Sequence, residues 1–564
     1  MSQATLERPA KEPTRTRRWR TTRRATALSA YGEPWLWLAS GALALALAMI
    51  AALVLLILVR GFGTFWPSEL LRIERKGAPA LLGEVTKEEL VTRPAADGMP
   101  ERTERRRMLR TGNYDLTGHH FEWVWDSEVE REARPEWALA VERTAWGRFH
   151  GEPVALVAGE RVLAEQPSEI LARLDDELAR AIEGREARHR LEVEEVGAVH
   201  HAMEVERLTL RHLEAEGGDA AQRAASIERT AELERQYEAL QRRLAELDVE
   251  NGRTVLRMRA PDGATKDLAL VDVVRAYPAN ALDWSAKLGV YLSRWWEFLT
   301  DVPREANSEG GVFPAIFGTV VMTLIMSLVV VPFGVLAALY LREYAKAGAL
   351  VSIVRICVNN LAGVPSIVFG VFGLGFFCMI LGTSIDELLF ADRLPNPTYG
   401  KGGLLWASLT LALLTLPVVI VATEEAIAAV PNSMREGSYG CGATKGQTIL
   451  RIVLPRALPG IMTGMILAIA RGAGEVAPLM LVGAVKLAPQ LAVDGTAPFV
   501  HPERSFLHLG FHVFDLGFQS QNSEAAKPMV YTTTLLLIGI VVTLNLTAIW
   551  IRSQLRKKYA ANPF

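Results

Sequence analysis

Residues 404–422 read LLWASLTLALLTLPVVIVA, and residues 423–460 continue as TEEAIAAVPNSMREGSYGCGATKGQTILRIVLPRALPG. The first part carries no charge and has the length of about 20 residues that a helix needs to cross the hydrocarbon core of a bilayer. The second part is polar and contains several glycines and prolines, which interrupt regular structure. Together they predict a membrane helix that runs into a structured polar loop.

Other apolar segments of similar length lie on both sides of this stretch. They are Trp35–Val59, Pro314–Leu341, Ile353–Leu381, Ile461–Val485 and Met529–Ile551. With Leu404–Ala422 they predict an all-α polytopic membrane protein with six transmembrane helices. Residues 311–559 then form a membrane core, and residues 60–310 form one large insertion after the first helix.

Positive charges indicate how these helices cross the membrane. Residues 1–34 are rich in arginine, and further lysines and arginines follow the second, fourth and sixth apolar segments. Loops with an excess of Lys and Arg remain in the cytoplasm. The sequence therefore predicts that both termini are cytoplasmic and that residues 60–310 lie outside the cytoplasm.

The insertion changes character along its length. Short β-rich runs occur on both sides of residues 167–250, which are rich in Glu, Arg, Ala and Leu. Leu233, Tyr237, Leu240, Leu244 and Leu247 recur at spacings of four and three, as in a coiled coil. Because Gly217 and Gly218 interrupt the pattern, we predict two antiparallel helices within an α+β insertion, which acts as a stalk or as a docking surface.

Composition excludes several functions. The net charge of −2 argues against a nucleic-acid-binding protein. Cys357, Cys378 and Cys441 provide neither a disulfide scaffold nor metal-ligand spacing, and the adjacent His200 and His201 have no carboxylate support. Gly400-Lys401 is followed by Gly402 rather than Ser or Thr, so no phosphate-binding P-loop is visible. We therefore expect no metal and no cofactor bound by this chain, and no enzyme activity of its own.

The polar loop of residues 423–460 has its own internal pattern. Gly440 and Gly442 separate two short amphipathic segments, and Pro455 and Pro459 are expected to end the second one before the next membrane helix. We predict two short helices on the cytoplasmic side.

This loop resembles the EAA loop of ABC importer permeases. The matching residues are Glu436, Gly437, Ser438, Gly442, Ala443, Ile452, Leu454 and Pro455. In that family the loop is a coupling helix that sits in a cleft of the ATPase subunit, so the resemblance implies the same role here. Gly437 and Ser438 stand where two alanines are usual, and this variant is itself similar to the phosphate permeases.

Three further segments resemble the Pst phosphate permeases, and the last is closer to the PstA type than to the PstC type. They are LAGVPSIVFG at residues 361–370, the segment Pro332–Tyr344, and ARGAGEVAPLM at residues 470–480. Gly472 and Val476 depart from the usual residues of the last segment. The resemblance covers the first helix and about residues 311–559, and it does not extend to the insertion.

The resemblance implies a type I ABC importer permease in the bacterial inner membrane, with a periplasmic insertion. The transported solute would be inorganic phosphate. A PstC-type second permease, a PstB-type ATPase dimer that uses ATP-Mg, and a periplasmic PstS-type phosphate-binding protein would complete the transporter.

Two sets of residues are candidates for the translocation pathway. Arg471 is a charge near the middle of the apolar segment 461–485, and Glu475 lies one helical turn further on. A guanidinium suits phosphate because it donates two parallel hydrogen bonds. The alternative is a structural ion pair.

The second set interrupts the apolar segment Ile353–Leu381. Its members are Asn359, Asn360, Pro365 and Ser366. Irregular backbone at membrane depth is tolerated only against protein or a water-filled cavity, so these residues are expected to line the pathway or to form a packing kink.

Two other functions fit parts of the sequence. A permease for sulfate, molybdate or another oxyanion would share the membrane helices and the loop. A membrane-anchored sensor would use the coiled coil, but it needs a cytoplasmic output domain, and no predicted cytoplasmic segment is long enough.

Overall fold

The structure is a computed structural model that describes residues 33–93, 102–215, 217, 219–346, 348–488, 490–495, 499–520 and 523–560. Most of the basic N-terminal segment, residues 1–32, lies outside this range. The chain divides into the units Met1–Leu58 and Val59–Phe564, which we describe separately. In the first unit, the described residues form most of helix α1 (Glu33–Gly63), whose large apolar side chains are exposed.

Six helical stretches of the described residues are long and apolar enough to cross a membrane. They are Pro34–Gly63, Phe313–Tyr344, Ser366–Leu389, Leu404–Ala428, Lys445–Gly472 and Ser523–Lys557. The number of membrane helices agrees with the sequence prediction, but the third and fifth helices differ in their bounds.

Two antiparallel sheets form the base of the insertion. The first has the order β4-β3-β2-β1-β5, with β1 (Leu70–Arg75), β2 (Ala78–Arg93), β3 (Arg102–Arg110), β4 (Phe121–Trp125) and β5 (Val129–Ala133). The second has the order β10-β9-β7-β6-β11, and β8 also pairs with β7. Its strands are β6 (Leu139–Arg143), β7 (Phe149–Ala158), β8 (Arg161–Ala164), β9 (Thr254–Arg259), β10 (Thr265–Ala269) and β11 (Val273–Pro278). Buried and exposed side chains alternate along strand β9, as its sequence predicts. Leu256 and Met258 are buried, while Arg257 and Arg259 are exposed.

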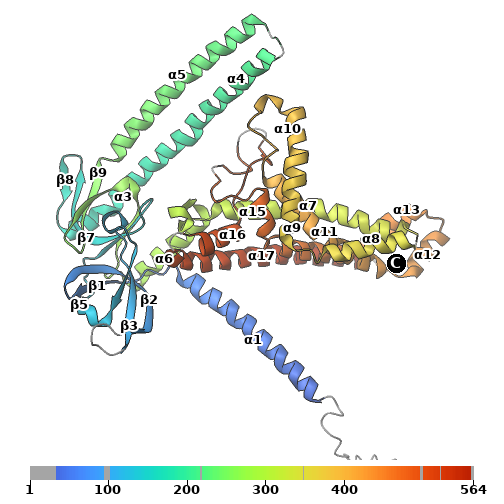
Figure 1. The fold of residues 1–564 in the computed structure, drawn as a ribbon, viewed down its shortest axis with the longest axis horizontal. Coiled ribbons are helices and arrows are strands. Elements are labelled where there is room, and N and C mark those ends of the chain that lie inside the picture. Colours follow the sequence, from blue (N-terminus) through green and yellow to red (C-terminus); the bar gives the residue numbers. More distant parts are fainter. Residues whose placement is uncertain are drawn as a thin grey trace, which may run out of the picture. The chain divides into compact units, whose positions relative to one another are not determined.

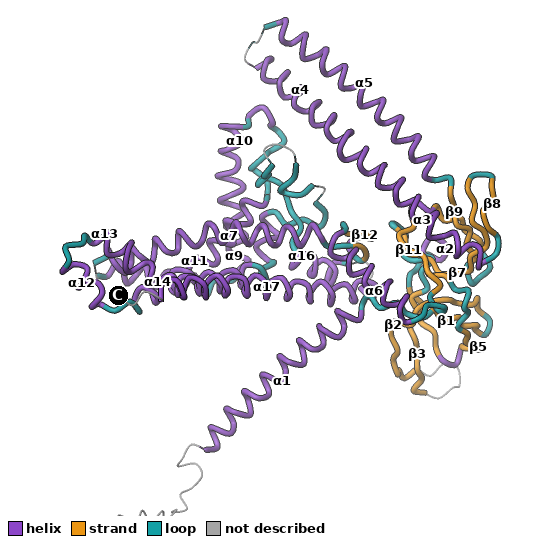
Figure 2. The backbone as a smooth tube through the Cα atoms, turned by 180° about the vertical axis from the view of Figure 1, so that it is seen from behind, coloured by secondary structure: helices purple, strands orange, loops and turns teal. Residues whose placement is uncertain are grey.

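A helical hairpin extends from the second sheet. Helix α3 (Pro167–Arg190) continues through the π-type turn η3 (Leu191–Val196) into α4 (Gly197–Ala215), and α5 (Ala220–Asn251) returns beside it. Both views show α4 and α5 as a long antiparallel pair (Figures 1 and 2). Ile170, Leu174 and Leu178 of α3 are buried in the core of the second sheet, so the hairpin and the sheet share one hydrophobic cluster.

Helix α6 (Trp284–Thr300) leads from the insertion to the membrane core. It is followed by the short strand pair β12 (Pro303–Arg304) and β13 (Glu309–Gly310). Smaller elements of the insertion are α2 (Tyr114–Thr117) and the single turns η2 (Asp126–Glu128), η4 (Leu270–Asp272) and η5 (Glu305–Asn307).

The membrane core consists of long helices joined by shorter ones. Its elements are α7 (Phe313–Leu339), η6 (Tyr340–Tyr344), α8 (Ala349–Leu361), α9 (Ser366–Phe372), η7 (Gly373–Gly382), α10 (Thr383–Leu389), η8 (Ala391–Arg393), α11 (Leu404–Ala428), α12 (Asn432–Gly440), α13 (Lys445–Thr448), η9 (Ile449–Val453), α14 (Leu454–Gly472), α15 (Ala477–Val482), α16 (Leu509–Phe514), η10 (Asp515–Gln519) and α17 (Ser523–Ala560). Helix α11 is the most buried of the six membrane candidates. It packs against α7 and α14 through small residues: a Cβ on Gly334 would lie 2.6 Å from Val419, and one on Gly464 would lie 2.8 Å from Ala422.

Hydroxyl groups inside this core bond to their own helices. Thr319, Thr323, Ser408, Thr410 and Thr415 each donate to a carbonyl oxygen four residues earlier, at 2.6–2.8 Å. Such bonds satisfy the hydroxyls without water, which an apolar environment requires.

The segment Ile353–Leu381 is interrupted, as the sequence predicted, whereas the prediction that Ile461–Val485 forms one continuous helix is wrong. The first is split, because α8 ends at Leu361 and α9 begins at Ser366. The second ends at Gly472 and α15 begins at Ala477. In both places a proline follows, and a proline has no N–H for the preceding turn and restrains the residue before it.

The prediction that Pro455 and Pro459 end the loop helix is also wrong. The helix runs from Lys445 through both prolines to Gly472. Pro455 lies in the first turn of α14, directly after the π-type turn η9 (Ile449–Val453), which relaxes the α-helical hydrogen-bond pattern at this point. The Thr463 hydroxyl bonds to the Pro459 carbonyl oxygen at 3.0 Å.

Candidate functional site

Arg471 and Glu475 lie at the junction between α14 and α15. Arg471 is in the last turn of α14, whereas Glu475 is in the non-helical turn that follows. The predicted position of Arg471 in mid-helix is therefore wrong, and Glu475 does not share a helix with it. The turn nevertheless brings them together, with Arg471 Nε 3.6 Å from Glu475 Oε1 and side chains that are 33% and 21% exposed.

A second irregular turn, between α8 and α9, holds the other predicted pathway residues. Asn359 and Asn360 are in the last turn of α8 and are exposed. Pro365 is exposed with extended backbone, and Ser366 begins α9 and is half-buried. The break that the sequence predicted in this segment is therefore present at residues 362–365.

The two breaks flank one apolar cluster. Leu361 at the end of α8 and Val364 in the first break pack against the cluster that contains Ala468 of α14 and Leu479 of α15. The short helices that follow the breaks touch directly, because a Cβ on Gly370 of α9 would lie 2.7 Å from the Cα of Pro478 in α15. Two broken helices thus meet in this core, and broken helices present free backbone groups and helix ends to a solute.

One further charged pair was missed from the sequence. Arg355 lies on α8, and its Nε is 3.5 Å from Oε1 of Glu424 on α11. Its Nη2 donates to the carbonyl oxygen of Leu341 at 3.3 Å. Thr423-Glu424-Glu425 at the end of an apolar run is the signal that points to this pair, but its partner depends on the fold.

The polar loop forms a compact cap after α11. Helix α12 carries Glu436, Gly437 and Ser438, and the chain then turns at Gly442, whose φ of 81° favours glycine. Glu436, Gly437 and Gly442 are exposed, whereas Ala443 is half-buried. The Ser438 hydroxyl lies 2.9 Å from that of Thr448, and Thr444 and Gln447 form a capping box that starts α13.

The remaining predicted loop residues anchor this cap to the core. Ile452, Leu454 and Pro455 are half-buried at the junction of η9 and α14. Leu454 packs against the cluster that contains Ile427 and Val453. These three residues therefore support the exposed turn and are not part of its surface.

Two contacts between the loop and the end of α7 were not predicted. Arg435 Nη2 lies 3.1 Å from Glu343 Oε1, and the Arg435 guanidinium also donates to the carbonyl oxygens of Ile427 and Val430. Lys445 lies 4.7 Å from the centre of the Tyr344 ring. These contacts attach the loop to η6, which directly follows α7.

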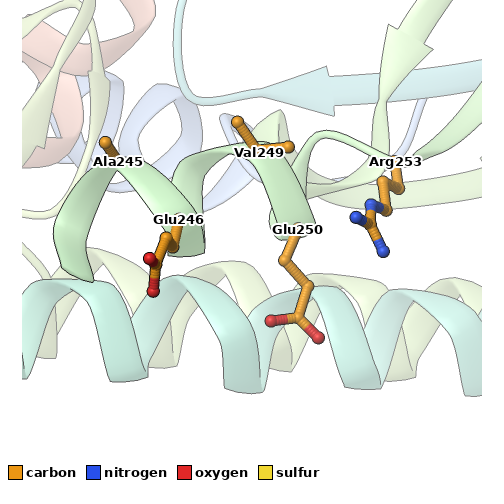
Figure 3. Close-up of a pocket in the computed structure, with 5 residues that line it drawn as sticks. All are labelled: Ala245, Glu246, Val249, Glu250 and Arg253. Carbon is orange, nitrogen blue, oxygen red and sulfur yellow. The ribbon is translucent and has the colours of Figure 1, made fainter. Parts of the chain in front are cut away.

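Other hollows and polar groups lie apart from the residues predicted for the site. One hollow is lined in part by polar side chains, where Asp515 lies 3.1 Å from Lys486 Nζ and accepts from Asn307 Nδ2 at 3.1 Å. Figure 3 shows a surface hollow at the end of α5, lined by Ala245, Glu246, Val249, Glu250 and Arg253, where the two carboxylates point away from the apolar side chains. His200 and His201 are exposed on α4. Among the described residues, no three His, Cys, Asp or Glu side chains group together in a way that suits a metal ion.

The insertion contains its own buried charges. Glu84 of β2 accepts from Arg148 Nη1 at 2.7 Å, and Glu142 of β6 accepts from Arg294 Nε at 2.9 Å. Burial opposes ionisation of Glu84, but Arg148, His150 and Arg110 outweigh it and lower the Glu84 pKa to about 2. Burial lowers the pKa of His150 to about 4, so this imidazole is neutral at pH 7.

Comparisons with known proteins agree on one family. Residues 330–560 match the family described as binding-protein-dependent transport system inner membrane component. The chain is 34% identical to the phosphate transport system permease protein PstA 1 of Mycobacterium tuberculosis over 261 residues, which cover 46% of this chain and 76% of that protein. It is 30% identical to the phosphate transport system permease protein PstA of Yersinia pestis, over 43% of this chain and 75% of that protein.

Solved structures of ABC transporters are also similar. A chain of the MetNI methionine ABC transporter in inward facing conformations is 21% identical, with a TM-score of 0.32, and the match covers 47% of this chain and 98% of that chain. Residues 330–560, which match the family, lie in the membrane core.

Proposed function

The chain belongs to the binding-protein-dependent transport system inner membrane components, the permease subunits of ABC importers, and we propose that the solute it carries is inorganic phosphate. As a permease of this family it is a multi-pass inner-membrane protein and not an enzyme. The relatives named above as phosphate transport permeases support the choice of solute.

The observation that carries this proposal is that the Arg471 guanidinium is partly exposed and makes no hydrogen bond to Glu475. Its guanidinium is one-third exposed at a helix break, and its distance of 3.6 Å from Glu475 is too long for a hydrogen bond. Within the described part of the chain, Glu475 is its only ion-pair partner. A guanidinium with unused donors binds a tetrahedral oxyanion through two parallel hydrogen bonds.

Glu475 has a complementary role in the proposed site. A carboxylate neutralises Arg471 when no anion is bound, and it accepts a proton-bearing oxygen of phosphate when one is. This preference for a protonated oxyanion favours phosphate over sulfate, which carries no proton at neutral pH. Asn359, Asn360, Pro365 and Ser366 would contribute amide, hydroxyl and backbone groups from the facing break.

The exposed turn of Glu436, Gly437 and Gly442 is proposed as the surface that docks into a partner ATPase dimer. Movement there would reach the end of α7 through Arg435 and Glu343. The complete transporter would further contain a PstC-type permease, a PstB-type ATPase and a PstS-type phosphate-binding protein. ATP-Mg would be bound by the ATPase alone.

The charge pattern of the loops supports the proposed orientation. The loop of residues 429–453 and the C-terminal end of α17 carry more Lys and Arg than Asp and Glu, so both are assigned to the cytoplasm. Residues 64–310 then lie in the periplasm, on the side from which phosphate arrives.

Replacement of Arg471 tests the solute and the site together. In the assembled transporter, Arg471→Ala is expected to reduce phosphate uptake at least about 100-fold, since it removes the charged donor from the anion (about 3 kcal/mol). Uptake of radiolabelled phosphate into proteoliposomes measures the effect, and copurification of the partner chains measures assembly.

The matched control is Arg456→Ala, an exposed arginine in the first turn of the same helix. It is expected to leave uptake within a factor of about two, as surface substitutions usually do. Normal uptake by Arg471→Ala would exclude Arg471 as a ligand. Sulfate uptake that is equal to phosphate uptake in the unaltered chain would exclude the proposed solute.

A further inference from the structure

Helix α6 buries its charged side chains and leaves part of its apolar surface exposed. Its charged residues are Lys287, Arg294 and Glu297, and all three point into the protein, with side chains that are 20%, 5% and 12% exposed. A helix on a water-covered surface places its charges outward and its apolar stripe inward.

Each inward charge has a partner in the insertion. Arg294 pairs with Glu142, and its Nη1 donates to the carbonyl oxygen of Phe65 at 2.9 Å. Glu297 accepts from Arg275 at 3.0 Å, and Lys287 lies 3.6 Å from Glu69. The orientation of the helix is therefore set by these pairs, and it cannot rotate to expose its charges without breaking them.

The outward face of α6 is apolar toward its C-terminal end. Leu292, Trp296 and Leu299 lie on one side at spacings of four and three residues, and Trp296 is 70% exposed. Val302 directly after the helix is also exposed. The other exposed positions of this face are Ser285, Gly289, Ser293 and Thr300, so it carries no charge.

The position of α6 relates this face to the bilayer. Phe298 of α6 packs in one cluster with Phe65 after α1, Ala315 in the first turn of α7, and Ala526 and Met529 in the first turns of α17. The Tyr291 hydroxyl donates to the carbonyl oxygen of Phe62 at 3.1 Å. The first turns of α7 and α17, and the residues that follow α1, thus lie beside α6.

We propose that α6 lies in the headgroup layer of the membrane, with Leu292, Trp296 and Leu299 facing the lipid. Tryptophan is enriched at this depth because its ring is apolar and its N–H is polar. The lipid replaces water as the surroundings of the uncharged face, which explains why the charges point inward. The insertion is thereby attached to the membrane surface at its base, independently of which solute is transported.

Site-directed spin labelling tests this proposal in the full chain. In a background in which Cys357, Cys378 and Cys441 are replaced by alanine, single cysteines are introduced as Leu292→Cys or Trp296→Cys and labelled in lipid nanodiscs. The control is Val249→Cys on α5, which is 65% exposed and distant in sequence from every membrane helix. Collision with oxygen reports lipid, and collision with a water-soluble nickel chelate reports water.

The labels at positions 292 and 296 are expected to be several-fold less accessible to the chelate, and more accessible to oxygen, than the label at position 249. Chelate accessibility equal to that at position 249 would overturn the proposal. Protection that arises only after the second permease or the binding protein is added would also overturn it, because a protein would then cover the face.

A conservative variant provides a second measurement. The chain has 13 tryptophans, and Trp296→Phe removes one of them while keeping an aromatic ring. Brominated phosphatidylcholine quenches the fluorescence of tryptophans that contact lipid. In nanodiscs of this lipid, a smaller fraction of the tryptophan fluorescence is expected to be quenched in Trp296→Phe than in the unaltered chain. If Trp296→Phe instead reduced only the fluorescence that the brominated lipid does not quench, Trp296 would not contact lipid.

Discussion

The membrane core and the insertion hold their parts together by different means. In the core, α7, α11 and α14 meet through glycines and other small residues, such as Gly334 against Val419 and Gly464 against Ala422. In the insertion, the sheets and α6 meet through buried ion pairs of Glu84 and Glu142 with Arg148 and Arg294.

The surroundings explain this difference. Lipid is as apolar as a leucine side chain, so helices in the core gain little from burying apolar surface and depend on close packing instead. The insertion has polar groups on its surface and apolar clusters inside, where a charge is tolerated only with a partner. We therefore expect added volume to damage the core, and lost charge or added protons to damage the insertion.

The largest effect is expected from a methyl group in the core. A Cβ on Gly318 of α7 would lie 2.0 Å from the carbonyl oxygen of Leu507, whereas one on Gly539 of α17 would meet no atom within 4 Å. Gly318→Ala is expected to cost more than about 5 kcal/mol and to yield little folded protein. Gly539→Ala is expected to be neutral. The yield of monodisperse protein from membranes measures both, and equal yields would show that packing does not limit the core.

The next effect concerns a buried charge of the insertion. Glu142→Gln leaves Arg294 without its carboxylate and is expected to destabilise the insertion by about 3–5 kcal/mol. Glu152→Gln, which removes an exposed pair with Arg259 at 3.4 Å, is expected to cost less than about 1 kcal/mol. Hydrogen exchange of strands β6 and β11 in the full chain measures the difference. Similar exchange rates in the two variants would mean that the buried pair of Glu142 and Arg294 contributes no more stability than the exposed pair of Glu152 and Arg259.

Acid is expected to weaken the insertion in two steps. Neutral His150 contributes stability that is complete above its unfolded pKa of 6.5 and is lost as the pH falls toward its folded pKa of about 4. Ionised Glu84 contributes stability that is complete above 4.5 and is lost as the pH falls toward 2. In both cases the unfolded state binds more protons, so stability decreases as the pH decreases.

Replacing the histidine separates the two steps. His150→Leu is expected to remove the dependence between about pH 6.5 and 4.5 and to leave the step below it. The exposed His200→Leu serves as the control and is expected to leave both steps in place. Thermal unfolding of the full chain, followed by tryptophan fluorescence at several pH values, provides the measurement. If His150→Leu still lost stability between about pH 6.5 and 4.5, a group other than His150 would be responsible for that step.

The smallest effect is expected from shortening the hairpin. Ile170, Leu174, Leu178, Leu191 and Leu244 are buried near its base, so only the outer residues, 195–240, can be replaced by a short glycine–serine link without opening the sheet. Contacts of the outer part with the core include the exposed Arg211, which donates to the carbonyl oxygen of Leu394 at 3.1 Å. Uptake at saturating phosphate is expected to stay within a factor of about two. Complete loss of uptake would instead support docking of a partner on the hairpin.

Much of the architecture was predictable because its signals are local. Length and hydropathy predicted the number of membrane helices, and the interruption at Gly217 and Gly218 predicted the paired helices of the insertion. Gly442 does adopt a positive φ in the predicted loop. Helix ends were less predictable. Pro455 continues a helix after a π-type turn, whereas Pro365 is the last residue of a break and Pro478 lies in the first turn after one. The same residue type therefore gave opposite outcomes.

The sequence provided candidate residues for the site but did not predict how they are arranged. Arg471 and Glu475 were predicted to meet across one helical turn, and they meet across a break instead. The contact between α9 and α15, and the pair of Arg355 with Glu424, join residues far apart in the sequence. Such contacts depend on helix packing, which no local pattern specifies.

The sequence by itself thus determined that the chain has six apolar segments long enough to cross a membrane, a large insertion and a structured polar loop. These features depend on composition and periodicity, which act within a few turns of the chain. Only the tertiary structure decided that two broken helices meet beside Arg471, and that α6 turns its charges inward and an apolar face outward. Those outcomes depend on which residues, far apart in the sequence, pair with each buried charge and pack against each helix end.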